Sequence, residues 1–271
     1  MKSYACFLDD LRRCAALGIQ LYNFHPGNTV GAPRPEAIAR IAAALNRAHK
    51  AVPAVKPLLE NMAGANNVIG SSFEDLRDII ALVEDKSRVG VCLDTCHAFA
   101  AGHDLRSGEK FGETLERFER VVGMRYLCAL HLNDSKAPFA SHRDLHANIG
   151  TGFLGLRAFW NVMNEKRFEG LPMVLETPID EESKDEVTGK PVEDKGVWAR
   201  EIKLLESLIG MDVEGEEFKA LEEGLAKKGE SAREKMLEAV RKKEMTEKEK
   251  GKGRGKRKKA ETTDEEGSAS E

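Results

Sequence analysis

The chain has 271 residues and a formal net charge of −4 at pH 7, which argues against a simple basic nucleic-acid binder. Hydrophobic residues make up 41% and charged residues 32% of the sequence, so we expect a sizeable core beneath a heavily charged surface. No apolar run reaches about 18 residues, the length that a membrane-spanning helix requires. Early charges at positions 9, 10, 12 and 13 argue against a signal peptide, and five scattered cysteines are typical of reduced, intracellular proteins.

Residues 1–210 alternate short apolar segments with amphipathic ones, beginning with a helix. The predicted strands are Gly18–Phe24, Val55–Leu59, Val89–Leu93, Arg125–Leu132 and Leu171–Leu175. The predicted helices between and after them are Arg34–Lys50, Ser72–Val83, Glu109–Val122, Leu156–Lys166 and Gly196–Ile209. Strands that are apolar on both faces and joined by crossovers of this length indicate a parallel α/β sheet. No phosphate-binding glycine motif follows any strand, so no nucleotide cofactor is predicted.

Potential metal ligands stand at the carboxyl end of every predicted strand, and two more follow the fourth strand in a glycine-rich loop. Because the carboxyl ends of parallel strands meet at one edge of a sheet, we expect these side chains to lie together. An unpaired carboxylate at the end of an apolar strand is costly to bury, so a shared cation is the economical explanation for Glu60 and Glu176. Imidazole and carboxylate together suit Zn²⁺, Mn²⁺ or Fe²⁺. The candidate ligands are His25, Glu60, Asp94, His97, His131, Asp144, His146 and Glu176.

Six runs of residues surround these candidates. They are Asn23–Gly27 (NFHPG), Leu59–Gly64 (LENMAG), Gly90–Gly102 (GVCLDTCHAFAAG), His131–Lys136 (HLNDSK), Asp144–Gly152 (DLHANIGTG) and Leu175–Thr177 (LET). Together they resemble endonuclease IV, the zinc-dependent apurinic/apyrimidinic (AP) endonucleases of AP endonuclease family 2. The resemblance covers about residues 4–210, and its most specific part is the run DTCHAFAAG.

The resemblance implies a TIM-type (β/α)8 barrel with three zinc ions at its carboxyl-terminal mouth. One zinc would be held by His25 and Glu60, and Glu60 would bridge to a second zinc. The expected catalytic residues are Glu60 and Glu176, because they would orient the hydroxide that attacks the phosphate 5′ to an abasic site. The remaining ligands would be Asp94, His131 and Glu176 for the second zinc and His97, Asp144 and His146 for the third.

The implied function is base-excision repair by a monomer that acts on double-stranded DNA with abasic sites and needs no membrane. Hydrolysis would leave a 3′-hydroxyl and a 5′-deoxyribose phosphate. The loop that follows the fourth strand faces DNA in this family, so Lys136 and Arg143 are predicted to contact phosphates weakly. Two other functions stay open: a metal-dependent sugar isomerase or epimerase on a related barrel, and a non-catalytic zinc- or DNA-binding remnant.

The chain also departs from the family pattern. Members of the family have three more βα units before the helix that begins here at Met1, and one further histidine ligand lies in that part. We therefore expect five of eight strands and eight of nine ligands, with an exposed sheet edge. The first zinc site would be compromised, and the activity would be weakened.

Residues 211–271 differ from the rest of the chain. They hold 16 Lys and Arg and 17 Asp and Glu, with one Phe and no Trp or Tyr. Such a composition buries too little apolar surface to offset the entropy of ordering, so we expect a largely disordered tail after a catalytic domain over 1–210. Marginal helices are predicted at Glu214–Ala226 and Ser231–Lys250. The basic cluster 251–259 is typical of a solvated linker, a nucleic-acid patch or a nuclear import signal, so we expect the nucleus, with the mitochondrion as a second location.

Overall fold

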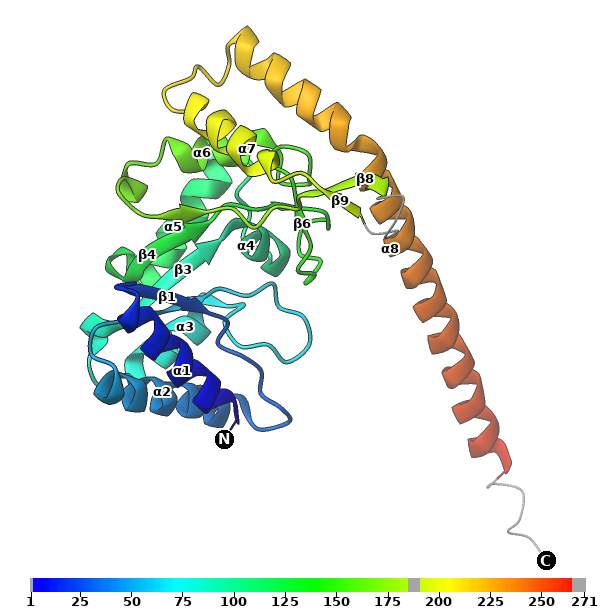
Figure 1. Ribbon diagram of the computed structural model, residues 1–271. Coiled ribbons are helices and arrows are strands. Elements are labelled where there is room, and N and C mark those ends of the chain that lie inside the picture. The colour runs from blue at the N-terminus through cyan, green and yellow to red at the C-terminus, as the bar shows by residue number, and fades with distance from the viewer. Residues whose placement is uncertain (1, 185–190, 265–271) are drawn as a thin grey trace, which may run out of the picture. The chain divides into compact units, whose positions relative to one another are not determined.

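A parallel sheet of five strands forms the centre of the computed structural model, which describes residues 2–184 and 191–264 (Figure 1). The strand order β1-β2-β3-β4-β7 follows the chain, and each neighbouring pair is parallel. This arrangement confirms the predicted parallel α/β fold. The strands are β1 (Leu21–Phe24), β2 (Lys56–Glu60), β3 (Gly90–Asp94), β4 (Leu127–His131) and β7 (Met173–Val174).

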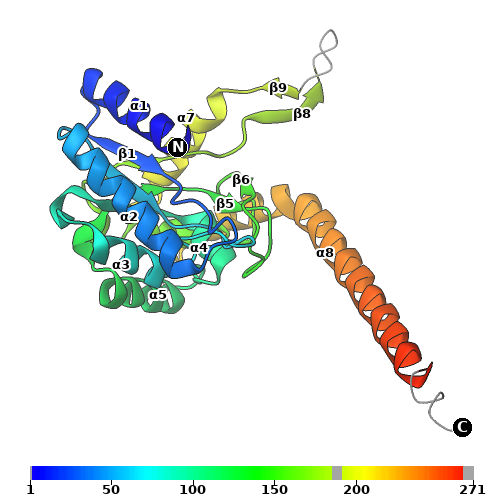
Figure 2. The same cartoon turned by 90° about the horizontal axis from the view of Figure 1, so that it is seen from below.

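Helices connect the strands and form an outer layer, in which α2 contacts α3, α3 contacts α5, α5 contacts α6 and α6 contacts α7 (Figure 2). A helix precedes the first strand, as predicted, and the five helices with predicted bounds begin and end within a few residues of them. These helices are α1 (Lys2–Ala16), α2 (Arg34–Ala51), α3 (Phe73–Leu82), α5 (Gly108–Val121), α6 (Leu156–Met163) and α7 (Gly196–Ser207).

Several short elements were not predicted from the sequence. One is helix α4 (Thr95–Ala101), which follows β3 directly and has too few residues to show a helical period. The others are the hairpin β5 (Asp134–Ser135) and β6 (His146–Ala147), the hairpin β8 (Asp180–Lys184) and β9 (Pro191–Glu193), and the 3-10 turns η1 (Lys86–Arg88), η2 (Met124–Tyr126) and η3 (Lys166–Phe168).

The amphipathic pattern of α5 shows how the helix layer forms. Ser107 caps its first turn by accepting the backbone N–H of Lys110. Apolar residues recur three, four and seven positions apart, which places them along one stripe of the helix. That stripe packs into the main core, where Phe111, Leu115 and Phe118 are buried.

The two faces of the sheet carry different residues, because neighbouring side chains of a strand point to opposite faces. Leu59, Leu93 and Leu130 belong to the core that the helices cover. Leu58, Cys92 and Ala129 form a separate small cluster on the other face. Two residues further along each strand, on this second face, come Glu60, Asp94 and His131.

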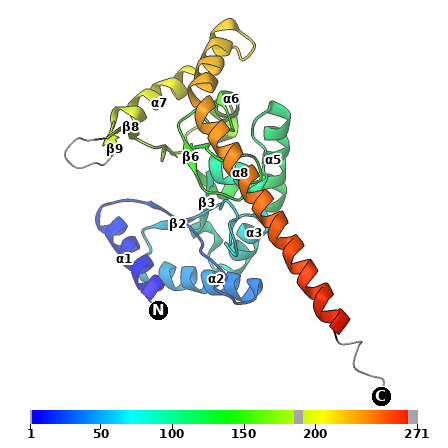
Figure 3. The same ribbon diagram turned by 90° about the vertical axis from the view of Figure 1, so that its right-hand side faces the viewer.

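At one edge of the sheet, α1 lies beside α2 and β1 (Figure 3). Phe7 of α1 packs against Phe24 with ring centroids 4.9 Å apart, and the Tyr22 hydroxyl donates to Asp10 Oδ2 at 2.9 Å. Within the described residues, β1 and β7 each pair with one strand only. The sheet is thus an open half of a TIM-type barrel, as the sequence predicts, since closure takes eight strands.

Helix α8 (Glu216–Asp264) occupies most of the segment in which the sequence predicts disorder with two marginal helices. Its first turns belong to the same compact unit as the sheet, which ends at Gly229. Phe218 is fully buried there, and Arg157 forms an ion pair with Glu214 at 2.8 Å. Residues 230–264 form a second unit that contains the basic cluster 251–259, and residues 265–271 lie outside the described residues.

Among the described residues, no helix combines the length and the apolar composition that crossing a bilayer would require.

Candidate metal centre

The carboxyl ends of the parallel strands bring four predicted ligands into one cluster. Glu60, Asp94 and His131 are the last residues of β2, β3 and β4, and Glu176 lies two residues beyond β7. The parallel register pairs Asp94 with His131. Each of the four offers an oxygen or nitrogen atom, and these atoms all lie within 4.8 Å of one another. The sheet therefore provides a group of three carboxylates and one imidazole that could hold a metal ion.

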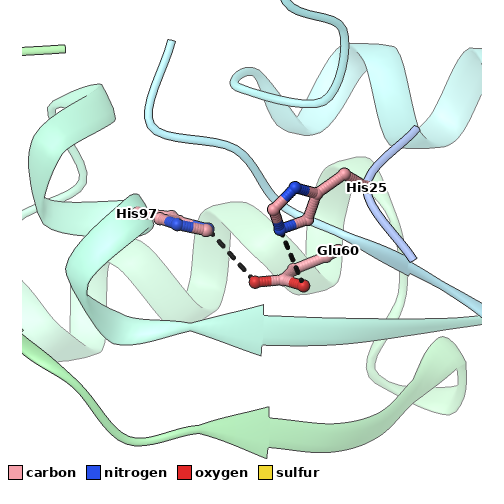
Figure 4. Close-up of side chains that lie close together, drawn as sticks. All are labelled: His25, Glu60 and His97. Carbon is pink, nitrogen blue, oxygen red and sulfur yellow. Dashed lines mark ion pairs between the residues drawn. The ribbon is translucent and has the colours of Figure 1, made fainter. Parts of the chain in front are cut away.

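Glu60 lies at the middle of the centre and contacts three imidazoles. His25 Nε2 is 3.3 Å from its Oε2, while His97 Nδ1 and His131 Nδ1 are 3.2 and 3.3 Å from its Oε1. Figure 4 shows Glu60 between His25 and His97. Burial raises the pKa of this carboxyl, but the three neighbouring imidazoles lower the pKa more, so the net pKa lies far below its usual range. Glu60 is therefore a buried, charged carboxylate.

A second group forms where α4 begins. The Asp94 side chain caps α4 by accepting the backbone N–H of His97 at 2.7 Å, which places the His97 ring at the sheet edge. His97 Nε2 lies 3.1 Å from Asp144 Oδ1, and His146 Nε2 lies 3.2 Å from the same oxygen. Asp144 precedes β6, which carries His146. The three predicted ligands of the third ion thus lie together.

The pKa values of His97, His131 and His146 are raised although these rings are largely buried. Burial lowers the pKa of His97, but Asp94, Asp144 and Glu60 raise the pKa to about 11. Burial likewise lowers the pKa of His131, and the neighbouring Glu176 and Glu60 help to reverse that shift. In the metal-free protein the carboxylates therefore hold protons on these rings. A bound cation would replace those protons.

Unpartnered atoms show that the centre fits metal ions. Four buried atoms of the candidate ligands make no hydrogen bond within the described part of the chain, although oppositely charged groups are close. Buried polar atoms in proteins are normally hydrogen-bonded. Besides thiolate sulfur, imidazole nitrogen and carboxylate oxygen are the ligand atoms that Zn²⁺ prefers in proteins. The four atoms are Glu60 Oε1, His97 Nε2, His131 Nδ1 and His146 Nε2.

Buried asparagines surround the ligands, and sequence reasoning missed them. Asn61 Oδ1 accepts the backbone N–H of Asp94 at 2.7 Å, and its Nδ2 donates to the Asp94 carbonyl at 3.1 Å. The Asn61 carbonyl oxygen lies 2.9 Å from His97 Nδ1. Partners of this kind orient metal ligands. Their only sequence signal was that Asn61 and Asn133 stand inside the runs LENMAG and HLNDSK.

The remaining predicted residues lie at the periphery. Lys136 and Arg143 are exposed on the loop between β5 and β6, which also carries Asp144. Their contact with DNA stays a prediction. Cys96 is buried, and burial raises the pKa of its thiol to about 12. It is therefore a small apolar residue and a poor metal ligand.

Comparison with known proteins shows what this chain is similar to. A family model described as a xylose isomerase-like TIM barrel, that of AP endonuclease 2, matches residues 1–208. The apurinic-apyrimidinic endonuclease 1 of Schizosaccharomyces pombe is 40% identical over 243 residues, which are 90% of this chain and 67% of that protein. The enzyme of the same name from Saccharomyces cerevisiae is 46% identical over 207 residues, 76% of this chain and 53% of that protein.

Among solved structures, endonuclease IV from Thermus thermophilus superimposes with a TM-score of 0.63 and 30% identity, covering 76% of this chain and 68% of that one. The chain thus spans between about half and two thirds of the length of these relatives.

Proposed function

Because this chain belongs to the AP endonuclease 2 family of xylose isomerase-like TIM barrels, we propose that it hydrolyses the phosphodiester bond 5′ to an abasic site in double-stranded DNA. The observation that carries the proposal is the cluster of Glu60, Asp94, His131 and Glu176 at one sheet edge. Relatives with 40% and 46% identity carry the name apurinic-apyrimidinic endonuclease. The reaction would leave a 3′-hydroxyl and a 5′-deoxyribose phosphate.

We propose zinc as the metal, with up to three ions. Zinc ions bound at this centre would supply a hydroxide at neutral pH and stabilise the charge that develops on the phosphate. His25 and Glu60 would hold the first ion, and Glu60 would share its carboxylate with the second. The other ligands would be Asp94, His131 and Glu176 for the second ion and His97, Asp144 and His146 for the third.

The chain's own residues leave one side of the centre open to a substrate. Asp94, His97 and Glu60 are buried, whereas the side chains of His25, Asp144 and Glu176 are 53%, 44% and 44% exposed. A phosphate would reach the centre between these exposed ligands. The buried ligands are held in place before the substrate arrives, Glu60 by its imidazole neighbours and Asp94 by its contact with the first turn of α4. A sugar isomerase would need at most two metals, so the His97–Asp144–His146 group favours the nuclease.

Glu176→Gln tests this assignment. Removing one anionic ligand should lower bound metal and slow cleavage on the order of 10²-fold, which corresponds to about 2.7 kcal/mol of transition-state stabilisation. Cleavage is measured on a duplex with one tetrahydrofuran abasic site, beside the same duplex without it. Glu165→Gln is the matched control, because Glu165 pairs with Arg167 at 2.7 Å at the start of η3 and contacts no candidate ligand.

Unchanged cleavage by Glu176→Gln would contradict the role of Glu176. Absence of cleavage by the unaltered, zinc-loaded chain would overturn the proposed function. Epimerisation of a ketose by that same preparation would favour the sugar isomerase instead.

We also propose that the basic cluster 251–259 directs the protein to the nucleus. Six of its nine residues are Lys or Arg, the composition of import signals. A fluorescent fusion that lacks residues 245–271 should spread into the cytoplasm, whereas one that lacks only 260–271 should stay nuclear. The preference for abasic over intact duplex should not change, since a basic cluster binds phosphates without sequence or lesion specificity. Nuclear retention of the longer deletion would refute the targeting role.

A further inference from the structure

A fully buried asparagine connects two carboxylates of the centre that come from different strands. Asn133 Nδ2 donates to Asp94 Oδ2 at 2.7 Å and reaches Glu176 Oε2 at 3.4 Å. Its Oδ1 accepts the backbone N–H of Glu176 at 2.9 Å. Asp94 ends β3 and Glu176 follows β7, and these strands are separated by β4 in the sheet. Asn133 therefore connects two ligands that the sheet does not pair directly.

The position and the direction of this amide are both fixed. Thr95 Oγ1 donates to the Asn133 carbonyl at 2.7 Å and accepts the Asn133 N–H at 2.9 Å, which holds its backbone to the start of α4. The backbone N–H of Glu176 can only donate, so it must face the amide oxygen. Both carboxylates then face the NH2 group, and a flipped amide would lose all of these contacts.

We infer that Asn133 is a positioning residue that holds Asp94 and Glu176 in the arrangement that binds metal. The amide N–H group shared between the two side chains keeps one oxygen of each turned towards Asn133, which fixes their relative position before a cation arrives. The amide also fixes the backbone at Glu176, a half-exposed ligand that lies beyond the end of its strand. Asn133 would touch neither DNA nor the reacting atoms. The inference rests on the proposed function only in taking Asp94 and Glu176 as metal ligands.

A purely structural role predicts a different outcome, and the chain offers a matched control. Asn161 of α6 is also buried, and its Nδ2 donates to the Leu105 carbonyl at 3.2 Å, away from the centre. Asn133→Ala and Asn161→Ala both remove a buried amide and leave a cavity of the same kind. If Asn133 only supports the fold, the two variants should behave alike towards metal.

The experiment measures Zn²⁺ affinity of the full chain by competition with a chromogenic chelator, with the Co²⁺ absorption spectrum as a second readout. Asn133→Ala should bind Zn²⁺ about 10- to 100-fold more weakly, the usual effect of removing a partner of a metal ligand. Its Co²⁺ spectrum should change. Asn161→Ala should keep both properties. Asn133→Ser keeps one hydrogen-bond donor and leaves a smaller cavity, so it should fold even if the alanine variant does not. Its affinity for Zn²⁺ should lie between those of the unaltered chain and Asn133→Ala.

Wild-type Zn²⁺ affinity and an unaltered Co²⁺ spectrum in a folded Asn133 variant would overturn the inference. An equal loss of Zn²⁺ affinity in Asn133→Ala and Asn161→Ala would also overturn the inference. An unaltered chain that binds Zn²⁺ without cleaving abasic duplex would refute the proposed function alone, and the affinity comparison would still decide the role of Asn133. An unaltered chain that binds no Zn²⁺ would overturn both.

Discussion

Glu60→Gln is expected to lower cleavage of abasic duplex by about a thousandfold, equivalent to roughly 4 kcal/mol of transition-state stabilisation. Glu60 is the one carboxylate among the described residues that contacts His25, His97 and His131 at once. Glutamine keeps the size of the side chain but removes the negative charge. Two proposed zinc sites would lose their shared anionic ligand, so bound zinc should fall as well.

Metal content is measured by elemental analysis of the purified variant, and cleavage on the duplex with one tetrahydrofuran site. Asp75→Asn is the matched control: Asp75 is also buried, but it pairs with Arg34 of α2 and with no candidate ligand. That variant should lose stability and keep its zinc. A Glu60→Gln protein with wild-type zinc content would show that the centre does not depend on this carboxylate.

Removal of zinc by a chelator is expected to lower the melting temperature by about 10 °C. A ligand at about a thousand times its Kd stabilises the folded state by about 4 kcal/mol, and each kcal/mol shifts the midpoint of a domain of this size by about 2–4 °C. The physical reason is that Glu60 is a buried carboxylate whose negative charge a bound cation would offset, and Asp94 and His97 are further buried ligands of the same centre. Thermal unfolding is recorded with and without chelator.

The difference in melting temperature should grow as the pH rises from about 6 to about 8. In the metal-free protein the pKa of His97 is raised to about 11, so protonation of His97 contributes stability that is fully present below its unfolded pKa of about 6.5 and lost as pH rises through the folded pKa. Zinc must displace that proton, so its binding strengthens as pH rises. The melting temperature of Glu60→Gln should change little when the chelator is added. A change as large as that of the unaltered chain would show that the stabilisation by zinc does not depend on Glu60.

The sequence by itself determined the parallel sheet and the positions of the candidate ligands. Apolar strands separated by amphipathic helices allow few topologies, and the carboxyl ends of parallel strands meet at one edge. Glu60, Asp94 and His131 could therefore be placed together before any contact was known. The resemblance to AP endonucleases added the grouping of His97 with Asp144 and His146, which the structure brings together.

Only the tertiary structure decided how those ligands are held. Asn133 contacts Glu176, which is 43 positions away in the sequence, and Asn61 contacts Asp94, which is 33 positions away. The periodic patterns of helices and strands relate residues only a few positions apart, so they do not predict these contacts. Such contacts depend on strand order and register, which are set by the packing of the whole sheet. The short helix α4 is likewise fixed by the Asp94 cap at the sheet edge. Residue types and local periodicity can be read from the sequence, whereas the orientation of a buried amide depends on how distant strands pair.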